Sequence, residues 1–134
     1  MERPYVICHI LSSLDGKITG PFMGTEAAGV LGAEYGRYRT EMNARALLYG
    51  TTTTKEFTSF RKPVLEETEE VPEGDFVADD RADLYFVSVD VDGEIGWESG
   101  IFCNKGRAPA HVIEVLTAST PAAYKACLRK TGVS

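Results

Sequence analysis

Four apolar runs, separated by polar and glycine-containing stretches, predict the strands of this chain. They cover residues 4–11, 44–49, 84–89 and 112–116. The first run is almost wholly apolar and rich in β-branched side chains. This composition is typical of a strand that is buried on both faces at the centre of a parallel sheet.

Three stretches between or after these runs predict helices. Four apolar residues recur at helical spacing and indicate an amphipathic helix with its stripe on the core, namely Leu31, Tyr35, Tyr38 and Met42. A short helix is expected over residues 51–57. In the last helix we expect Thr120 as the N-cap, Pro121 at the first position and Gly132 as the stop.

Strands and helices therefore alternate, which predicts an α/β domain with a mostly parallel central sheet. A length of 134 residues suits one domain. The last helix carries the chain back toward the sheet, but no strand follows it. We therefore expect residues 1–134 to be the N-terminal part of a longer domain that has further strands, or to complete its sheet with a second copy.

Composition narrows the classes of partner. The net charge of −6 argues against a nucleic-acid partner, since phosphate binding requires a basic patch. The apolar runs are too short to span a membrane. Cys8, Cys103 and Cys127 show no paired spacing and predict free thiols, as in a cytoplasmic protein.

A polar cluster follows the first predicted strand and includes Ser13, Asp15 and Lys17. Ligands of open α/β sheets bind outside the carboxyl ends of strands, so Asp15 is a candidate for orienting a ring N–H or managing a proton. Asp15 is equally interpretable as an ordinary Asp-Gly turn residue. His9 lies within the predicted strand, either as a core histidine or as part of the cleft wall.

A second candidate site follows the second predicted strand, where Gly50 precedes Thr51, Thr52 and Thr53. Hydroxyls and free backbone N–H groups at the start of a helix can bind an anion, although a threonine-rich cap is the simpler interpretation. The segment has neither a P-loop lysine nor a G-x-G-x-x-G fingerprint. The acidic run at residues 66–70 is typical of a solvated surface, and we expect no metal site there.

Taken in order, three segments resemble one family: Ser13-Leu14-Asp15-Gly16, the strand and threonine run at residues 46–53, and the predicted strand at residues 110–117. The chain is similar over nearly its whole length to the reductase domain of the bifunctional riboflavin-biosynthesis deaminase/reductase. This resemblance implies the three-layer dihydrofolate-reductase fold, here without its C-terminal strands. It also implies hydride transfer from NADPH, or from NADH, to a small pterin-like or pyrimidine-like heterocycle.

The resemblance also implies roles for individual residues. Gly50, Thr51, Thr52 and Thr53 would cradle the cofactor's phosphates, with Ser88 near the adenosine ribose and Thr117 close by. Asp15 would be catalytic, and His9, Ser13 and Lys17 would contact the substrate. The implied partners are a small-molecule substrate and a second copy in a homodimer.

The chain departs from the family pattern in three places. His9 stands where a lysine is expected, Phe57 and Thr58 stand where an acidic residue is expected, and the distal Gly-Gly segment would come after Ser134. A non-catalytic ligand-binding or scaffolding member of the same fold is therefore the alternative. An acidic interaction module at residues 66–70 is a third interpretation.

Overall fold

A computed structural model of the chain describes residues 3–67, 71–104 and 106–134. The predicted acidic run at residues 66–70 thus lies partly outside the described residues. The chain divides into two compact units, an N-terminal unit that ends at Ala44 and a C-terminal unit, Arg45–Ser134. Within the described residues the fold is α/β, with three α-helices and a mixed four-stranded sheet.

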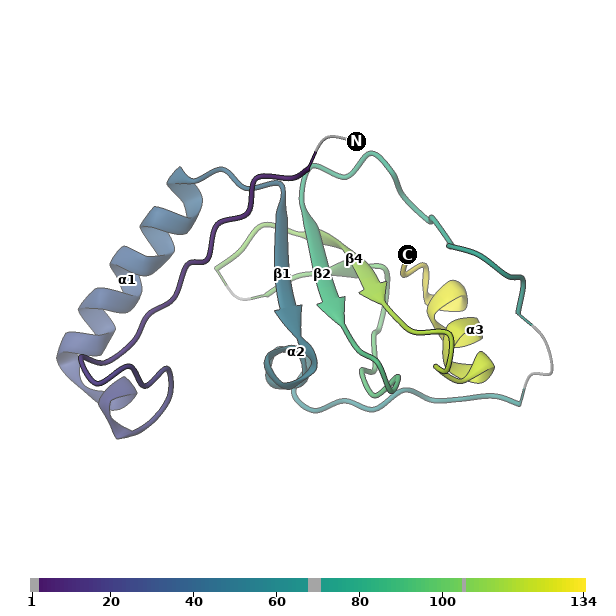
Figure 1. The fold of residues 1–134 in the computed structure, drawn as a ribbon, viewed down its shortest axis with the longest axis horizontal. Coiled ribbons are helices and arrows are strands. Elements are labelled where there is room, and N and C mark those ends of the chain that lie inside the picture. The colour runs from purple at the N-terminus through teal and green to yellow at the C-terminus, as the bar shows by residue number, and fades with distance from the viewer. Residues whose placement is uncertain (1–2, 68–70, 105) are drawn as a thin grey trace. The chain divides into compact units, whose positions relative to one another are not determined.

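The C-terminal unit contains the whole sheet, in the order β1-β2-β4-β3. Strands β1 (Ala46–Gly50), β2 (Tyr85–Val89) and β4 (Ala110–Val115) are parallel, and their arrowheads reach the same edge in Figure 1. The short strand β3 (Ile101–Phe102) is antiparallel to β4. The predicted second, third and fourth strands are therefore confirmed to within two residues, and β3 was missed.

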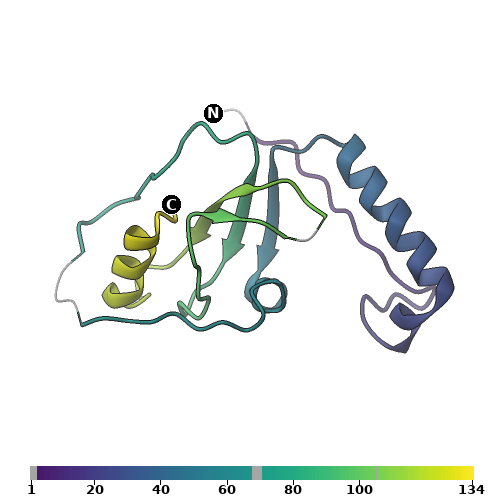
Figure 2. The ribbon, with the colours of Figure 1, turned by 180° about the vertical axis from the view of Figure 1, so that it is seen from behind.

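The core covers one face of this sheet. Phe86 pairs in register with Leu47 and Val112, and its ring lies 5.0 to 6.2 Å from four other aromatic rings, those of Tyr49, Phe57, Trp97 and Phe102. In the view from behind, the green chain around β3 crosses in front of the sheet (Figure 2). This loop contributes much of the aromatic cover.

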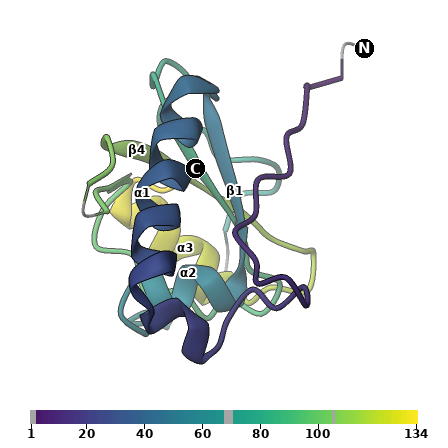
Figure 3. The same cartoon turned by 90° about the vertical axis from the view of Figure 1, so that its left-hand side faces the viewer.

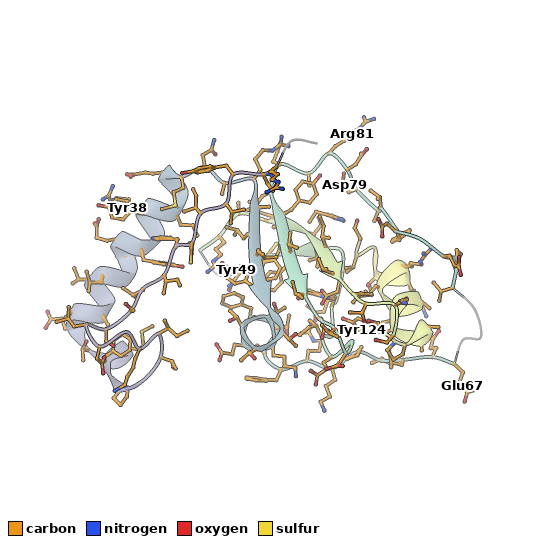
Figure 4. The ribbon with its side chains drawn as sticks, viewed as in Figure 1. Tyr38, Tyr49, Glu67, Asp79, Arg81 and Tyr124 are labelled. Carbon is orange, nitrogen blue, oxygen red and sulfur yellow. The ribbon has the colours of Figure 1, made fainter. Side chains whose placement is uncertain are left out.

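Helices α2 (Thr51–Phe57) and α3 (Ala122–Thr131) pack on the same core. Figure 4 shows Tyr49 beside α2 and labels Tyr124, which is fully buried. The predicted stop of α3 at Gly132 is confirmed, because Gly132 adopts the left-handed conformation with φ 77°. The predicted N-cap is wrong: Pro121 is the cap residue, and the Thr120 hydroxyl donates instead to Val91 O at 2.9 Å.

The N-terminal unit contains a 3₁₀ turn (Pro21–Gly24) and helix α1 (Glu26–Glu41), which Figure 3 shows along its length. The Thr25 hydroxyl accepts a hydrogen bond from Ala28 N at 3.2 Å and caps α1. The predicted helix is confirmed, but the expected packing of its apolar stripe on a core is wrong, because no residue of α1 is buried. Its apolar stripe is largely exposed, as Tyr38 illustrates in Figure 4.

The predicted first strand is wrong. Residues 4–11 have no strand structure, and Tyr5 and Val6 are 92% and 77% exposed. An apolar run indicates a tendency toward burial, but a strand also needs a neighbour that accepts and donates ladder hydrogen bonds. This segment packs on α1 instead, because the His9 ring stacks on Tyr35 at 4.0 Å and Tyr35 Oη donates to His9 O at 3.0 Å.

Candidate functional site

Three loops meet at the carboxyl edge of the parallel strands in the C-terminal unit. Gly50 ends β1 opposite Val89 of β2, which in turn lies opposite Val115 of β4. The Thr51 hydroxyl donates to Val89 O at 2.7 Å, and the Thr120 hydroxyl reaches the loop after β2 in the same way. These two bonds hold the ends of all three strands together at one edge of the sheet.

The loop after β1 is built from small residues with hydrogen-bonding groups. Gly50 precedes α2 in an extended conformation, and no side chain caps the first amides of the helix. A Cβ built on Gly50 meets no atom within 4 Å, so the space beside it is open. Thr52 is exposed at the first turn of α2. Backbone N–H groups and hydroxyls at this position are suited to an anionic group.

The loop after β4 adds a second group of hydroxyls. Thr117 Oγ1 lies 2.9 Å from Ser119 Oγ and 3.3 Å from Thr120 Oγ1. Thr117 N donates to Thr120 Oγ1 at 3.1 Å, which fixes the turn. Thr117 and Ser119 are exposed, so their hydroxyls can exchange partners with a ligand.

Ser88 lies on β2 next to this edge, but its side chain is fully buried. Its hydroxyl donates to Glu114 Oε1 at 3.1 Å across the sheet. A ligand at the edge would therefore meet the main chain near Ser88 and not its hydroxyl.

A buried acidic network lies beneath the edge, and sequence reasoning did not identify it. Glu114 Oε2 accepts from Trp97 Nε1 at 2.7 Å. Asp90 Oδ2 accepts from Glu94 N at 2.6 Å, from Ile95 N at 3.0 Å and from the hydroxyl of Tyr124 at 3.2 Å. Asp90 Oδ1 is buried and has no hydrogen-bond partner among the described residues.

Burial raises the pKa of Glu114 to about 8, and the nearby charge of Asp90 acts in the same direction. The hydrogen bonds from Trp97 and Ser88 act against this shift but are weaker than the cost of desolvation. Burial likewise raises the pKa of the Tyr124 phenol, helped by the charges of Glu114 and Asp90. The only indication of this buried network in the sequence was Glu114, a single acidic residue within the predicted strand at residues 112–116.

Asp15 lies in the N-terminal unit, in a turn closed by a hydrogen bond from Ser13 N to Lys17 O at 2.9 Å. Its carboxylate lies 2.9 Å from Lys17 Nζ and is 61% exposed. The Lys17 ammonium, followed by the Ser13 hydroxyl, lowers the pKa of Asp15. Because residues 4–11 are not a strand, the expectation of a carboxylate in a dry cleft at a strand end is wrong.

The candidate residues thus fall into two groups. Gly50, Thr51, Thr52, Thr53, Ser88 and Thr117 belong to one sheet edge in the C-terminal unit. His9, Ser13, Asp15 and Lys17 belong to the N-terminal unit.

Within residues 3–67, 71–104 and 106–134 no cluster of three or more His, Cys, Asp or Glu residues is arranged to hold a metal ion. None of the helices seen in them combines the length and apolar character needed to cross a bilayer.

Comparison with known proteins found no relative. No protein-family model matches the chain, and neither the curated proteins nor the solved structures include a significant match to its sequence or fold.

Proposed function

We propose that the chain acts as an NAD(P)H-dependent reductase that transfers hydride to a small pterin-like or pyrimidine-like heterocycle, on a dihydrofolate-reductase-like fold. The observation that carries the proposal is the edge where β1, β2 and β4 end. Hydroxyl-rich loops follow β1 and β4 there, beside open space at Gly50. In parallel α/β sheets this edge is where ligands bind.

The chemistry of the edge fits a dinucleotide. The amides at the start of α2 and the hydroxyls of Thr52 and Thr53 would bind the pyrophosphate, and Thr117 would contact the sugar–phosphate chain from the opposite loop. The cofactor, when bound, supplies the hydride. We propose NADPH as the cofactor. NADH is the alternative, because the loop at residues 90–92 contains no cation that would select the 2′-phosphate of NADPH.

On the substrate side, the proposed role of Asp15 is orientation. Its lowered pKa makes Asp15 a carboxylate near neutral pH, which can accept a hydrogen bond from a ring N–H but has no proton to donate. Ser13 and Lys17 already hold this carboxylate in place. His9 would contribute a ring face or a ring nitrogen to the same substrate.

We expect NADPH, NADH or both to bind the full chain saturably, as measured by nicotinamide fluorescence during titration. Thr52→Val removes one exposed hydroxyl while keeping the shape of the side chain. It should weaken binding about tenfold, since a hydrogen bond to a charged group contributes roughly 1.5–3 kcal/mol. Thr40→Val is the matched control, because Thr40 bonds within α1 to Gly36 O. Absence of binding by both cofactors would refute the proposal.

A non-catalytic ligand-binding member of the same fold is the second candidate. It is favoured by the exposure of Asp15 and by its pairing with Lys17, since catalytic carboxylates usually lie in less solvated sites. We expect Asp15→Asn to reduce NADPH oxidation with a pterin or aminopyrimidine panel about a hundredfold while leaving cofactor affinity unchanged. Asp80→Asn, also at an exposed position, is the control. Equal, background-level oxidation by all three proteins would favour the binding module.

A further inference from the structure

A cavity of about 300 Å³ lies within the C-terminal unit, between the end of α2 and the loop around β3. Its apolar wall is formed mainly by three aromatic side chains, those of Phe57, Trp97 and Phe102. The rings of Trp97 and Phe102 meet edge to face, with their centroids 5.6 Å apart. None of the lining residues belongs to the sheet edge proposed to bind the cofactor, so this cavity has no role in the proposed reductase.

The wall that carries Trp97 is fixed by main-chain hydrogen bonds on either side of it. Gly96 N donates to Arg61 O at 3.0 Å and ties the start of the loop to the opposite wall. Gly100 O accepts from Val112 N at 2.8 Å and ties the loop to β4. The cavity is therefore formed in advance, which favours binding because a ligand has little order to impose when it enters.

The opposite wall contains two residues in a rare backbone conformation. Ser59 and Phe60 have φ angles of 54° and 56°, in the left-handed region that residues with a side chain seldom adopt. Phe60 N donates to Lys55 O at 2.7 Å and Arg61 N donates to Thr58 O at 3.2 Å, so this segment is held in its conformation. Backbone strain of this kind clusters at ligand-binding sites. Here it brings Arg61 to the cavity.

Arg61 and Glu98 are the two charged side chains among the described residues that line the cavity. Arg61 Nη2 lies 2.8 Å from Glu98 Oε1, and the two side chains are 45% and 75% exposed. An exposed ion pair contributes little to stability, so Glu98 can be displaced at low cost. The planar guanidinium group of arginine binds a carboxylate through two parallel hydrogen bonds. Glu98 thus occupies the position that the carboxylate of a ligand can take.

We propose that this cavity binds a small aromatic carboxylate, with its ring against the three aromatic side chains and its carboxylate on Arg61 in place of Glu98. The volume suits one ring or two fused rings, because it is at the lower end of the range for ligand sites. Arg61 is the less exposed member of the ion pair, which favours a carboxylate over an ammonium group. An ammonium group would pair with Glu98 in a more solvated position, where water competes for it.

Trp97 is the only tryptophan of the chain, so its fluorescence reports the entry of a ligand. The full chain is titrated with benzoate and phenylacetate, and with benzamide and benzylamine, which keep the ring but lack the carboxylate. We expect both carboxylates to change the emission saturably and to bind about tenfold more tightly than benzamide, since hydrogen bonds between charged groups are the stronger ones. Equal affinity for benzoate and benzamide, tighter binding of benzylamine, or no saturable binding of benzoate up to about 10 mM would overturn the proposal.

Two variants should shift the affinity for benzoate in opposite directions. Arg61→Gln removes the cation and should weaken binding about tenfold, to the level of benzamide. Arg81→Gln is the matched control, because Arg81 is 92% exposed and does not line the cavity. Glu98→Gln removes the competing carboxylate and should tighten binding. Unchanged affinity in Arg61→Gln refutes the proposal. If Arg61→Gln does not fold, Glu98→Gln decides, and unchanged or weaker binding by that variant overturns the proposal.

Discussion

Gly100→Ala is expected to destabilise the C-terminal unit by about 3 kcal/mol or more, which is at the upper end of the cost of overpacking. A Cβ built on Gly100 lies 1.9 Å from Gly132 O and 2.6 Å from Gly132 C. Gly100 O also accepts the amide of Val112 at 2.8 Å, so the backbone cannot move away without breaking a bond to β4. The added methyl group therefore separates the end of α3 from the sheet.

Urea unfolding followed by Trp97 fluorescence and far-ultraviolet circular dichroism measures this loss. Gly50→Ala adds the same methyl group in the same unit, where the new Cβ meets nothing within 4 Å. Its cost should stay below about 1 kcal/mol, the scale of a changed helix cap. Equal unfolding midpoints for the two variants would show that the close approach at Gly132 does not constrain the fold.

The elements predicted well from sequence are those whose signals are local. The bounds of α2 follow from Gly50 and the threonine run, and the end of α3 follows from a glycine able to adopt positive φ. The run at residues 84–89 is bounded by polar residues on both sides and became β2. In each case the residues that define the element lie within it or directly beside it in the sequence.

The prediction of a strand at residues 4–11 was wrong for the opposite reason. Their apolarity is local information, whereas a strand requires a partner that comes from elsewhere in the chain. The periodicity of apolar residues does not show which other segment, if any, forms the ladder hydrogen bonds with this one. The same limit explains why β3 was missed, because its two residues are a strand only through their bonds to β4.

The candidate site shows the same division. The position of Thr51 at a strand end could be predicted, but its bond to Val89 O, which spans 38 residues, could not. The acidic network was invisible for the same reason, since Asp90, Trp97 and Glu114 come from different elements. The one local signal was Glu114, the single acidic residue of the predicted strand at residues 112–116.

The second large effect is a fall in stability as pH rises. The pKa of Glu114 is raised to about 8 in the folded state from an ordinary value of 4.5, so between these pH values the folded state keeps a proton that the unfolded state has lost. The contribution of the protonated Glu114 carboxyl to the free energy of unfolding is fully present below pH 4.5 and is lost as pH rises toward 8. At about 1.4 kcal/mol for each pH unit, the full loss is about 5 kcal/mol as an order of magnitude.

Urea unfolding at pH 6, 7, 8 and 9 covers the part of this window in which other carboxyls are already ionised. We expect the free energy of unfolding to fall by about 2 kcal/mol between pH 6 and 8 and to level off above pH 8. Glu114→Gln should show no such fall and should be the more stable protein at pH 9, because its amide is never charged. A parallel decline in both proteins would assign the pH dependence to other groups. Such a decline would also mean that water or the hydrogen bonds from Trp97 and Ser88 offset the cost of burying the ionised carboxyl, so that Glu114 keeps an ordinary pKa in the folded state.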